Sequence, residues 1–303
     1  MPCRLPHLGL TLILAGTTCA ASVAEPDVAS SDTVNTSVVP LNLGYTPFPV
    51  LPVQVRPAEP EESAPFIPKG SIDAGIGFHS LTAGQQNWNS QFVRGVYASD
   101  PKNTWTGEVS HMRQFGSTGT LFVAGNTHVL NDDWYMSTSL ATSSGGFFLP
   151  RYRIDMVANR KFLEARNLVI GAGLSTIKAK DEHKDLAVLL SAAYYFESPW
   201  VIEGGVRINR SNPGSVVTSY YSVAATYGRD KERYISLRLA AGREGYQLVS
   251  NTGNALANFS SQDAMLTWRE WVGRDWGFQV RVGAYHNPYY RRVGGEFNLF
   301  LDF

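Results

Sequence analysis

The chain ends with the stretch Arg292-Val293-Gly294-Gly295-Glu296-Phe297-Asn298-Leu299-Phe300-Leu301-Asp302-Phe303. Every second residue from Phe297 to Phe303 is apolar, and successive side chains of a strand point to opposite faces, so these residues share one face. The other face is mostly polar and includes Glu296 and Asn298. This pattern is typical of a strand with lipid on one side and water on the other. A strand of a soluble sandwich shows the same pattern, so the rest of the chain has to decide between them.

The composition favours a β protein that does not bind nucleic acid. Of 303 residues, 44% are hydrophobic and 17% are charged, and the formal net charge is +0. About a quarter of an average soluble domain is charged, so charged residues are scarce here. The 28 glycines and the aromatic fraction of 12% are typical of β proteins with many turns. A neutral balance argues against nucleic acid as a partner.

Residues 1–24 have the pattern of a secretory signal peptide. Arg4 supplies the positive charge, residues 8–15 form a short apolar core, and Ser22-Val23-Ala24 matches a cleavage site. Cleavage after Ala20 is the alternative. The apolar core is much shorter than the roughly 20 residues of a membrane-spanning helix. We therefore expect Sec-dependent export.

Both cysteines, Cys3 and Cys19, lie in this segment, so the mature chain is expected to hold no disulfide. No later stretch has the roughly 18 consecutive apolar residues that a membrane-spanning helix requires. Membrane-spanning β-strands remain possible, because the hydropathy signal of each such strand is weak.

Residues 25–70 are expected to form a proline-rich periplasmic linker. Eight prolines occur from Pro40 to Pro68. Proline fixes φ and has no N–H to donate, so neither a helix nor a sheet ladder fits this spacing. An extended or unstructured segment is expected. Residues 41–55 are more apolar, and the alternative is that they dock on another part of the chain.

From Ser71 onward, short runs of alternating hydrophobicity are separated by turn residues. Each run is close to the roughly 9–11 residues with which a tilted strand crosses a membrane. We predict an all-β fold, a transmembrane antiparallel up-and-down β-barrel of about fourteen strands (roughly twelve to sixteen) over residues 71–303. The expected strands are Ser71–His79, Asn89–Ala98, Thr104–Gln114, Thr118–Val129, Trp134–Ser143, Arg151–Phe162, Leu168–Lys178, Asp185–Phe196, Trp200–Asn209, Val216–Gly228, Tyr234–Tyr246, Phe259–Val272, Trp276–Asn287 and Tyr290–Phe303.

The connections between these runs fall into two alternating sets. One set is short and rich in the residues of tight turns, at 100–103, 131–133, 164–167, 198–199, 229–232 and 273–275. The other set is more varied and longer on average, at 80–88, 115–117, 144–150, 179–184, 210–215, 247–258 and 288–289. Outer-membrane barrels have short periplasmic turns and longer external loops, so we expect the first set in the periplasm together with both termini.

Aromatic residues recur beside the tight turns and at the C-terminus. They predict an interfacial girdle of Trp105, Trp134, Trp200, Tyr234, Trp276 and Phe303. The alternative is that aromatic residues are simply frequent in strands. An aromatic end to an amphipathic strand also resembles the C-terminal signature of bacterial outer-membrane barrels. That likeness implies outer-membrane lipid, lipopolysaccharide and the barrel-assembly machinery as partners.

Charged residues are expected on the inner face of the strands. The predicted lumen-lining set is Arg94, Glu108, Arg151, Arg153, Asp155, Glu203, Arg207, Arg238, Glu244, Arg269, Arg281 and Glu296. One interpretation is a hydrated pore whose acidic and basic rows contact a polar solute. The other is a lumen closed by arginine–carboxylate pairs, among which Glu296 is expected to pair with Arg281 across the last hairpin.

The histidines give little support for catalysis or metal binding. None of them forms a close pair such as His-x-x-x-His, so no metal or other cofactor is expected. His79, His183 and His286 lie near the expected external strand ends. An enzyme acting at the barrel rim is therefore an alternative, although isolated histidines at strand ends are more often interfacial polar residues.

The barrel portion resembles the YaiO family of outer-membrane β-barrels. The likeness covers about residues 72–303 and rests on Tyr234–Arg243, Ala264–Trp271 and Trp276–Phe303. Many family members carry helical tetratricopeptide repeats before the barrel, whereas this chain has the proline-rich linker. The resemblance implies a membrane barrel, and some relatives are associated with exopolysaccharide export. It transfers no catalytic residue.

These observations predict a non-enzymatic barrel in the bacterial outer membrane. We expect a porin-like conduit or accessory for a polar solute, with exopolysaccharide as one candidate. The first alternative is a structural or adhesion barrel whose external loops, above all 247–258, bind a partner. The second is a hydrolase at the rim.

Overall fold

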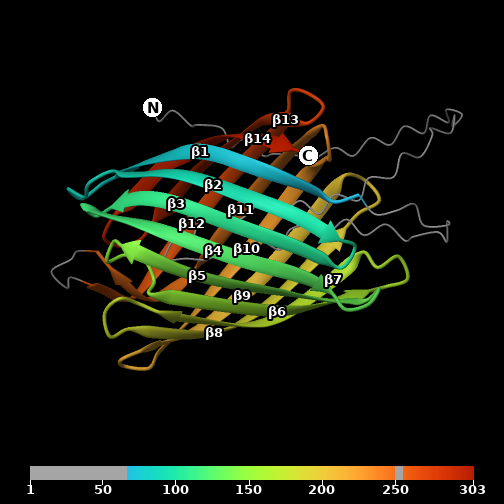
Figure 1. Cartoon of the computed structure of the whole chain (residues 1–303). Helices are drawn as coiled ribbons and strands as arrows, with labels where there is room; N and C mark the ends of the chain where they lie inside the picture. Colours follow the sequence, from blue (N-terminus) through green and yellow to red (C-terminus); the bar gives the residue numbers. More distant parts are fainter. Residues whose placement is uncertain (1–66, 250–254) are drawn as a thin grey trace, which may run out of the picture. The chain divides into compact units, whose positions relative to one another are not determined.

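The computed structural model describes residues 67–249 and 255–303. They form a closed antiparallel barrel of fourteen strands (Figure 1), which confirms the predicted fold and strand number. The expected signal peptide (1–24) and most of the expected linker (25–70) lie outside the described residues. No helix in the described part of the chain is long and apolar enough to span a membrane.

The strands follow one another in chain order around the barrel. Their bounds are β1 Lys69–Leu81, β2 Trp88–Asp100, β3 Asn103–Gln114, β4 Ser117–Val129, β5 Trp134–Gly145, β6 Tyr152–Phe162, β7 Leu168–Lys178, β8 Lys184–Tyr195, β9 Trp200–Asn212, β10 Val216–Arg229, β11 Arg233–Leu248, β12 Ala255–Trp271, β13 Trp276–His286 and β14 Arg291–Asp302. β1 begins at Lys69, slightly before the expected barrel boundary at residue 71.

The barrel closes between its first and last strands. β1 pairs with β14 in a register that sets Ile76 opposite Phe297 and Ser71 opposite Asp302. Closure leaves no strand edge unpaired, so every strand finds hydrogen-bond partners on both sides. A spanning sheet needs this, because lipid offers no hydrogen bonds to the backbone.

The two faces of the sheet meet different surroundings. In β14, Phe297 and Leu299 are 46% and 53% exposed on the outer surface, whereas Asn298 between them is 0% exposed. Ile235 and Leu237 of β11 are outward in the same way. So many exposed apolar side chains are expected only where lipid is the solvent.

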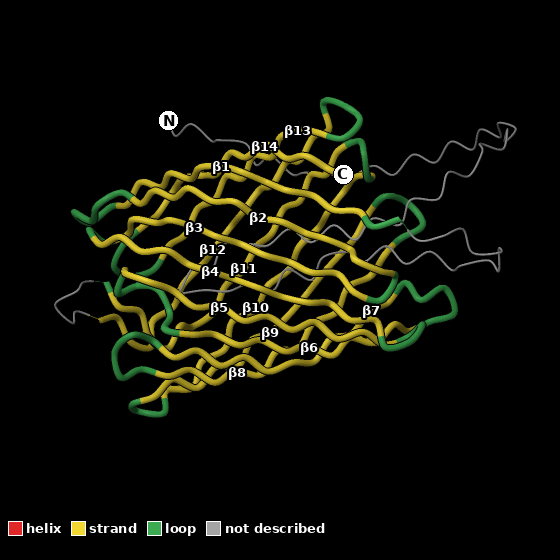
Figure 2. Tube along the Cα trace, viewed as in Figure 1, coloured by secondary structure: helices red, strands yellow, loops and turns green. Residues whose placement is uncertain are grey.

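The tight turns lie at one end of the barrel, together with the start of β1 and the end of β14 (Figure 2). We name this end the turn end. The Phe303 amide donates to the Gly70 carbonyl at 2.9 Å, and the Asp302 amide donates to Asp275 of the β12–β13 turn at 2.6 Å. The turns are closed by Asx contacts, as where Asp100 Oδ1 accepts the Lys102 amide at 2.8 Å. We name the opposite end, with the other connections, the loop end.

The prediction from the sequence was wrong for one connection at the loop end. A loop was expected over 247–258, but β11 runs to Leu248 and β12 begins at Ala255. The reason is that the ladder continues, with Gln247 opposite Leu256 and Leu248 opposite Ala255. The backbone N–H and C=O groups of these residues are therefore paired between the two strands.

The facing of β14 can be tested with one charge. Leu299→Arg puts a guanidinium on the lipid side, which costs about 2–4 kcal/mol near the midplane of the bilayer. We expect the variant to be largely lost from outer-membrane fractions, while Tyr289→Arg, at an exposed residue of the β13–β14 turn, assembles like the wild type. Equal amounts of both folded variants on heat-modifiable gels would contradict the facing.

Candidate functional site: the barrel interior and its loop-end pocket

The candidate site is the interior wall and the pocket at its loop end. Of the predicted lumen charges, those that are buried on inward positions are Arg94, Glu108, Arg153, Glu244, Arg269, Arg281 and Glu296. Those that are inward and half-buried are Asp155, Glu203, Arg207 and Arg238. Most of these residues form ion pairs, instead of separate rows of acidic and basic side chains.

Glu296 links two arginines in the largest of these groups. Its Oε2 lies 3.2 Å from Nη1 of Arg281 and 3.4 Å from Nη1 of Arg94. Arg94 also lies 3.2 Å from Glu108. The expected Arg281–Glu296 pair is confirmed, since the two residues stand directly opposite each other in β13 and β14. All four side chains are almost fully buried, so each charge depends on its partners.

A second group surrounds Arg269 near the turn end. Its Nη1 lies 3.2 Å from Asp73, its Nη2 lies 3.8 Å from Asp302, and its guanidinium stacks 3.5 Å above the Phe300 ring. A cation over an aromatic face is attracted by the ring quadrupole. Arg269 is therefore held on three sides.

A third group lies further toward the loop end. Arg238 and Arg292 both approach Asp263, at 3.2 and 4.0 Å. Large paired side chains thus cover the interior of β1–β3 and β11–β14, and a further pair, Arg153 and Asp155 at 2.7 Å, lies on β6. On this side the wall agrees with the interpretation of a lumen closed by arginine–carboxylate pairs.

The wall of β7–β9 is built differently. Glu203, Arg207 and Asn209 of β9 are half-buried, and Arg207 Nη1 donates to Ser175 Oγ at 3.4 Å. Many of the inward positions are Gly, Ala or Ser, and these are Gly171, Gly173, Ser175, Ala187, Ser191, Ala193 and Gly205. The two sides of the interior therefore differ in how far side chains reach inward.

Aromatic side chains meet at the loop end of the interior. Trp88 packs edge-on against Phe115 with ring centroids 4.9 Å apart, and against Tyr290 at 6.4 Å. Gln247 Nε2 donates to Tyr290 Oη at 2.9 Å. Phe147 lies 6.4 Å from Phe115 and brings in the β5–β6 loop. The next residues of that loop, Phe148 and Leu149, are buried against Met112 and Leu121.

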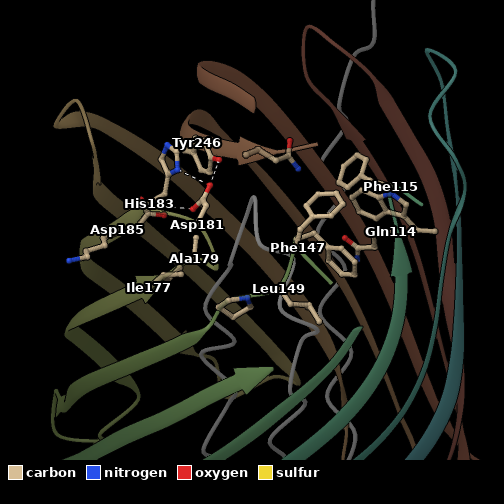
Figure 3. A pocket seen from close by; sticks show the side chains of 15 residues that line it. Gln114, Phe115, Phe147, Leu149, Ile177, Ala179, Asp181, His183, Asp185 and Tyr246 are labelled. Carbon is tan, nitrogen blue, oxygen red and sulfur yellow. Dashed lines mark hydrogen bonds and ion pairs between the residues drawn. The ribbon is translucent and has the colours of Figure 1, made fainter. Parts of the chain in front are cut away.

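A pocket of about 630 Å³, which includes open solvent, lies beside this cluster. Figure 3 shows Phe115 and Phe147 on one side of it and Asp181, His183 and Tyr246 on the other. Polar and apolar groups therefore face the same space.

The polar side of the pocket is organised around Asp181 in the β7–β8 loop. Its Oδ2 accepts a hydrogen bond from Tyr246 Oη at 2.6 Å and lies 2.9 Å from His183 Nδ1, and its Oδ1 accepts the His183 amide at 2.9 Å. The His183 and Tyr246 rings stack with centroids 3.3 Å apart. Burial acts to raise the pKa of the Asp181 carboxyl, but the bonds from Tyr246 and His183 outweigh it and hold that pKa below its ordinary value.

Two predicted site residues lie elsewhere than expected. Arg151 precedes β6, is exposed, and donates to the Lys180 carbonyl at 3.3 Å, so it belongs to the loop end and not to the strand interior. Tyr234 shares the inward parity of Arg238 and packs edge-on against the buried Trp271 at 5.5 Å, so it is not part of an outer girdle. Parity in the strand, and not proximity to a turn, decides which way its side chain faces. The remaining girdle residues are exposed on the outer surface at the turn end, namely Trp105, Trp134, Trp200, Trp276 and Phe303.

The sequence prediction missed the carboxylates Asp73 and Asp263 and the pocket residues Asp181 and Tyr246. Strand parity could have found the first two, because both occupy inward positions. Parity also places Tyr246 of β11 on the inner face. Asp181 carries no such signal, because it lies in the β7–β8 loop.

The histidines are not gathered into one site. His79 is inward in β1, His183 lies in the β7–β8 loop, and His286 is outward in β13. Within residues 67–249 and 255–303, no group of three or more His, Cys, Asp or Glu side chains is placed to hold a metal ion.

The family model of the YaiO membrane beta barrel domain matches residues 69–247, which is more than half of the chain. The chain belongs to the YaiO family. The match runs from β1 into β11, so the resemblance seen in the last three strands lies beyond it. A comparison with curated proteins finds no matching sequence.

Solved structures similar to this YaiO-family barrel are membrane barrels of low sequence identity. The anion-selective porin from Comamonas acidovorans is 8% identical over 78% of this chain and 99% of the porin, with a TM-score of 0.46. The KdgM porin in complex with disordered oligogalacturonate is 12% identical over 77% of this chain and 99% of its own, with a TM-score of 0.41. A bacterial polysaccharide outer membrane secretin is 10% identical over 78% and 98%, with a TM-score of 0.47. Similarity at this level carries no argument about activity or ligand.

The ion-pair group of this YaiO-family barrel gives a stability prediction. Glu296→Gln leaves Arg281 buried without its carboxylate, which is expected to lower the free energy of unfolding by about 3–5 kcal/mol. Urea unfolding of the folded protein in lipid measures the change. The control is Glu232→Gln in the exposed β10–β11 turn, with an expected change within about 0.5 kcal/mol. Equal effects of the two substitutions would show that the buried group is not stabilising.

The Asp181 contacts give a pH prediction. Because the pKa of Asp181 is lowered in the folded loop, its contribution is fully present above the ordinary pKa of 3.8 and is lost as the pH falls through the lower folded value. We expect protection of the His183 amide from hydrogen exchange to fall in that acidic range. Asp181→Asn should remove the pH dependence and Glu182→Gln should keep it. Unchanged protection in acid would contradict the assignment.

Proposed function

We propose that this outer-membrane barrel is a non-enzymatic conduit for a polar solute, and that the solute is a saccharide chain. The observation that carries the proposal is the difference between the two sides of the interior. Paired arginines and carboxylates fill one side, while Gly, Ala and Ser alternate with half-buried Glu203, Arg207 and Asn209 on the other. A barrel of this strand number is wider than side chains alone fill. The wall of β7–β9 is then the route.

The pocket lies at the loop end of that route. Ile177 of β7 and Asp185 of β8 line the pocket, and the inward residues that follow them are Ser175 and Ala187. A solute that leaves the pocket along β7 and β8 therefore meets small side chains first. Ser175 and Ala187 are each 1% exposed in this structure, so passage along β7 and β8 requires the side chains that cover them to move.

The chemistry of the pocket favours a saccharide among polar solutes. Aromatic faces such as Phe115 and Phe147 pack against the C–H faces of sugar rings, and the carboxylate of Asp185 and the amide of Gln114 can bond their hydroxyl groups. A site with both kinds of group suits a ligand with both kinds of surface.

The orientation follows from the two ends. We propose that the turn end, with both barrel termini, faces the periplasm and that the loop end faces outward, because short turns are typical of the periplasmic side. Sec export by residues 1–24 and a periplasmic linker over 25–70 belong to the same proposal, as do assembly through the C-terminal strand and contact with an export partner.

A non-enzymatic role is proposed because the one His–Asp contact in the pocket lacks a nucleophile. Of the described hydroxyl groups, the one bound to Asp181 is Tyr246 Oη, and it donates to the carboxylate instead of to His183. Acyl transfer requires a nucleophile that donates to its base.

One observation favours the adhesion alternative. β11 and β12 are the longest strands, with 16 and 17 residues, and their hairpin lies at the loop end. Replacing residues 249–254 by a short turn would abolish binding of a surface partner in an adhesion barrel and leave conductance unchanged.

Conductance in planar bilayers tests the conduit. We expect channel events from the folded protein. Ser191→Trp fills an inward position flanked by Gly171 and Gly205 and should lower the conductance of single channels by about half or more. Ala192→Trp, one residue on and facing lipid, is the matched control and should leave it unchanged. Folded wild-type protein without channel events would overturn the proposal.

A further inference from the structure

Basic residues ring the outer surface of the barrel at the loop end. Six of them occupy outward strand positions and are named the basic collar: Arg113 (β3), Lys178 (β7), Lys184 (β8), Arg210 (β9), Arg243 (β11) and Arg291 (β14). In the described residues, no Asp or Glu occupies an outward strand position at this end. The sequence of residues 250–254 holds no charge. The acidic residues in the described loops at this end are Asp181 and Glu182 of the β7–β8 loop, so the cationic character belongs to the outward strand positions.

Two collar lysines at this end face each other directly. Lys178 stands opposite Lys184 across β7 and β8. Arg210 follows on β9, opposite Leu186 and thus beside Lys184 on the outer face. Like charges directly opposite each other destabilise a sheet. Such an arrangement is relieved when an anion lies between them.

The collar differs in its partners from two of the cations at the turn end. Lys231 and Arg233 at the turn end pair with Asp302 and Glu270, at 2.8 and 3.3 Å. No salt bridge of the described residues contains a collar residue.

The collar side chains bond neutral groups instead. Arg243 Nε donates to Asn258 Oδ1 at 2.9 Å, and Arg210 Nη2 donates to Ser215 Oγ at 2.9 Å. These contacts orient the guanidinium groups, and no carboxylate of residues 67–249 and 255–303 forms a salt bridge with them.

We propose that the basic collar binds the phosphate groups of lipopolysaccharide in the outer leaflet. Guanidinium groups bind phosphate in a bidentate manner, and cations beside the membrane surface attract anionic headgroups. The lipid A phosphates lie at the level where the apolar outer surface ends, and the collar follows the apolar rows on the same strands. The inference rests on the proposed orientation, with the loop end outward, and is independent of passage through the lumen.

Titration of the folded full-length chain in detergent with fluorescent lipopolysaccharide tests the collar. Arg210→Gln, Arg243→Gln and Arg291→Gln are combined in one variant, because all three side chains are exposed. We expect its affinity to fall at least about tenfold. The matched control combines Arg160→Gln, Arg229→Gln and Arg274→Gln, three exposed arginines at the turn end, and should stay within about twofold of the wild type.

A second measurement uses the wild-type protein alone. Lipopolysaccharide stripped of its lipid A phosphates should bind the wild-type protein at least about tenfold more weakly than the intact lipid does. This comparison holds even if the collar variant fails to fold. Equal affinity for both lipids, or an equal loss in the control variant, would overturn the proposal. The titration requires no channel, so failure of the collar and failure of the conduit are separate results.

Discussion

Backbone hydrogen bonding is the constraint on which this structure depends. A chain in the hydrocarbon core has no water to satisfy its N–H and C=O groups, so a spanning sheet must close on itself. The pairing of β1 with β14 completes that closure and sets Ile76 opposite Phe297. A shift by one residue would exchange the inner and outer faces. The closing register therefore also decides which side chains meet lipid.

The same alternation forces charges into the interior, where they need partners. Glu296 is bound by Arg281 and Arg94, and Arg269 lies between Asp73 and Phe300. Breaking such a pair costs more than the pair contributes, because it leaves a buried charge uncompensated. The ion pairs on β1–β3 and β11–β14 therefore restrict which side chains that side of the wall can carry. Side-chain size can vary more on the opposite side.

Much of the fold could be predicted because alternation is a local property of the chain. Strand number, the two sets of connections and the inward position of Arg281 all follow from spacing. A partner could be predicted only across one hairpin, as for Glu296, since the turn sets the register there. The contact of Arg94 with the same carboxylate depends on closure between distant strands. The pocket depends on how loops pack, which a period of two residues does not encode.

The interior is filled by different means at different heights. Ion pairs fill the middle and the turn end, whereas aromatic loop residues such as Phe115, Phe147 and Tyr290 meet at the loop end. Those loops lie outside the ladder, so they can change without disturbing closure or facing. The β7–β8 loop carries Asp181 and His183, and β7 and β8 carry the small inward residues below it. Recognition at the mouth and width along the wall are therefore set by neighbouring parts of the same two strands, and each can vary alone.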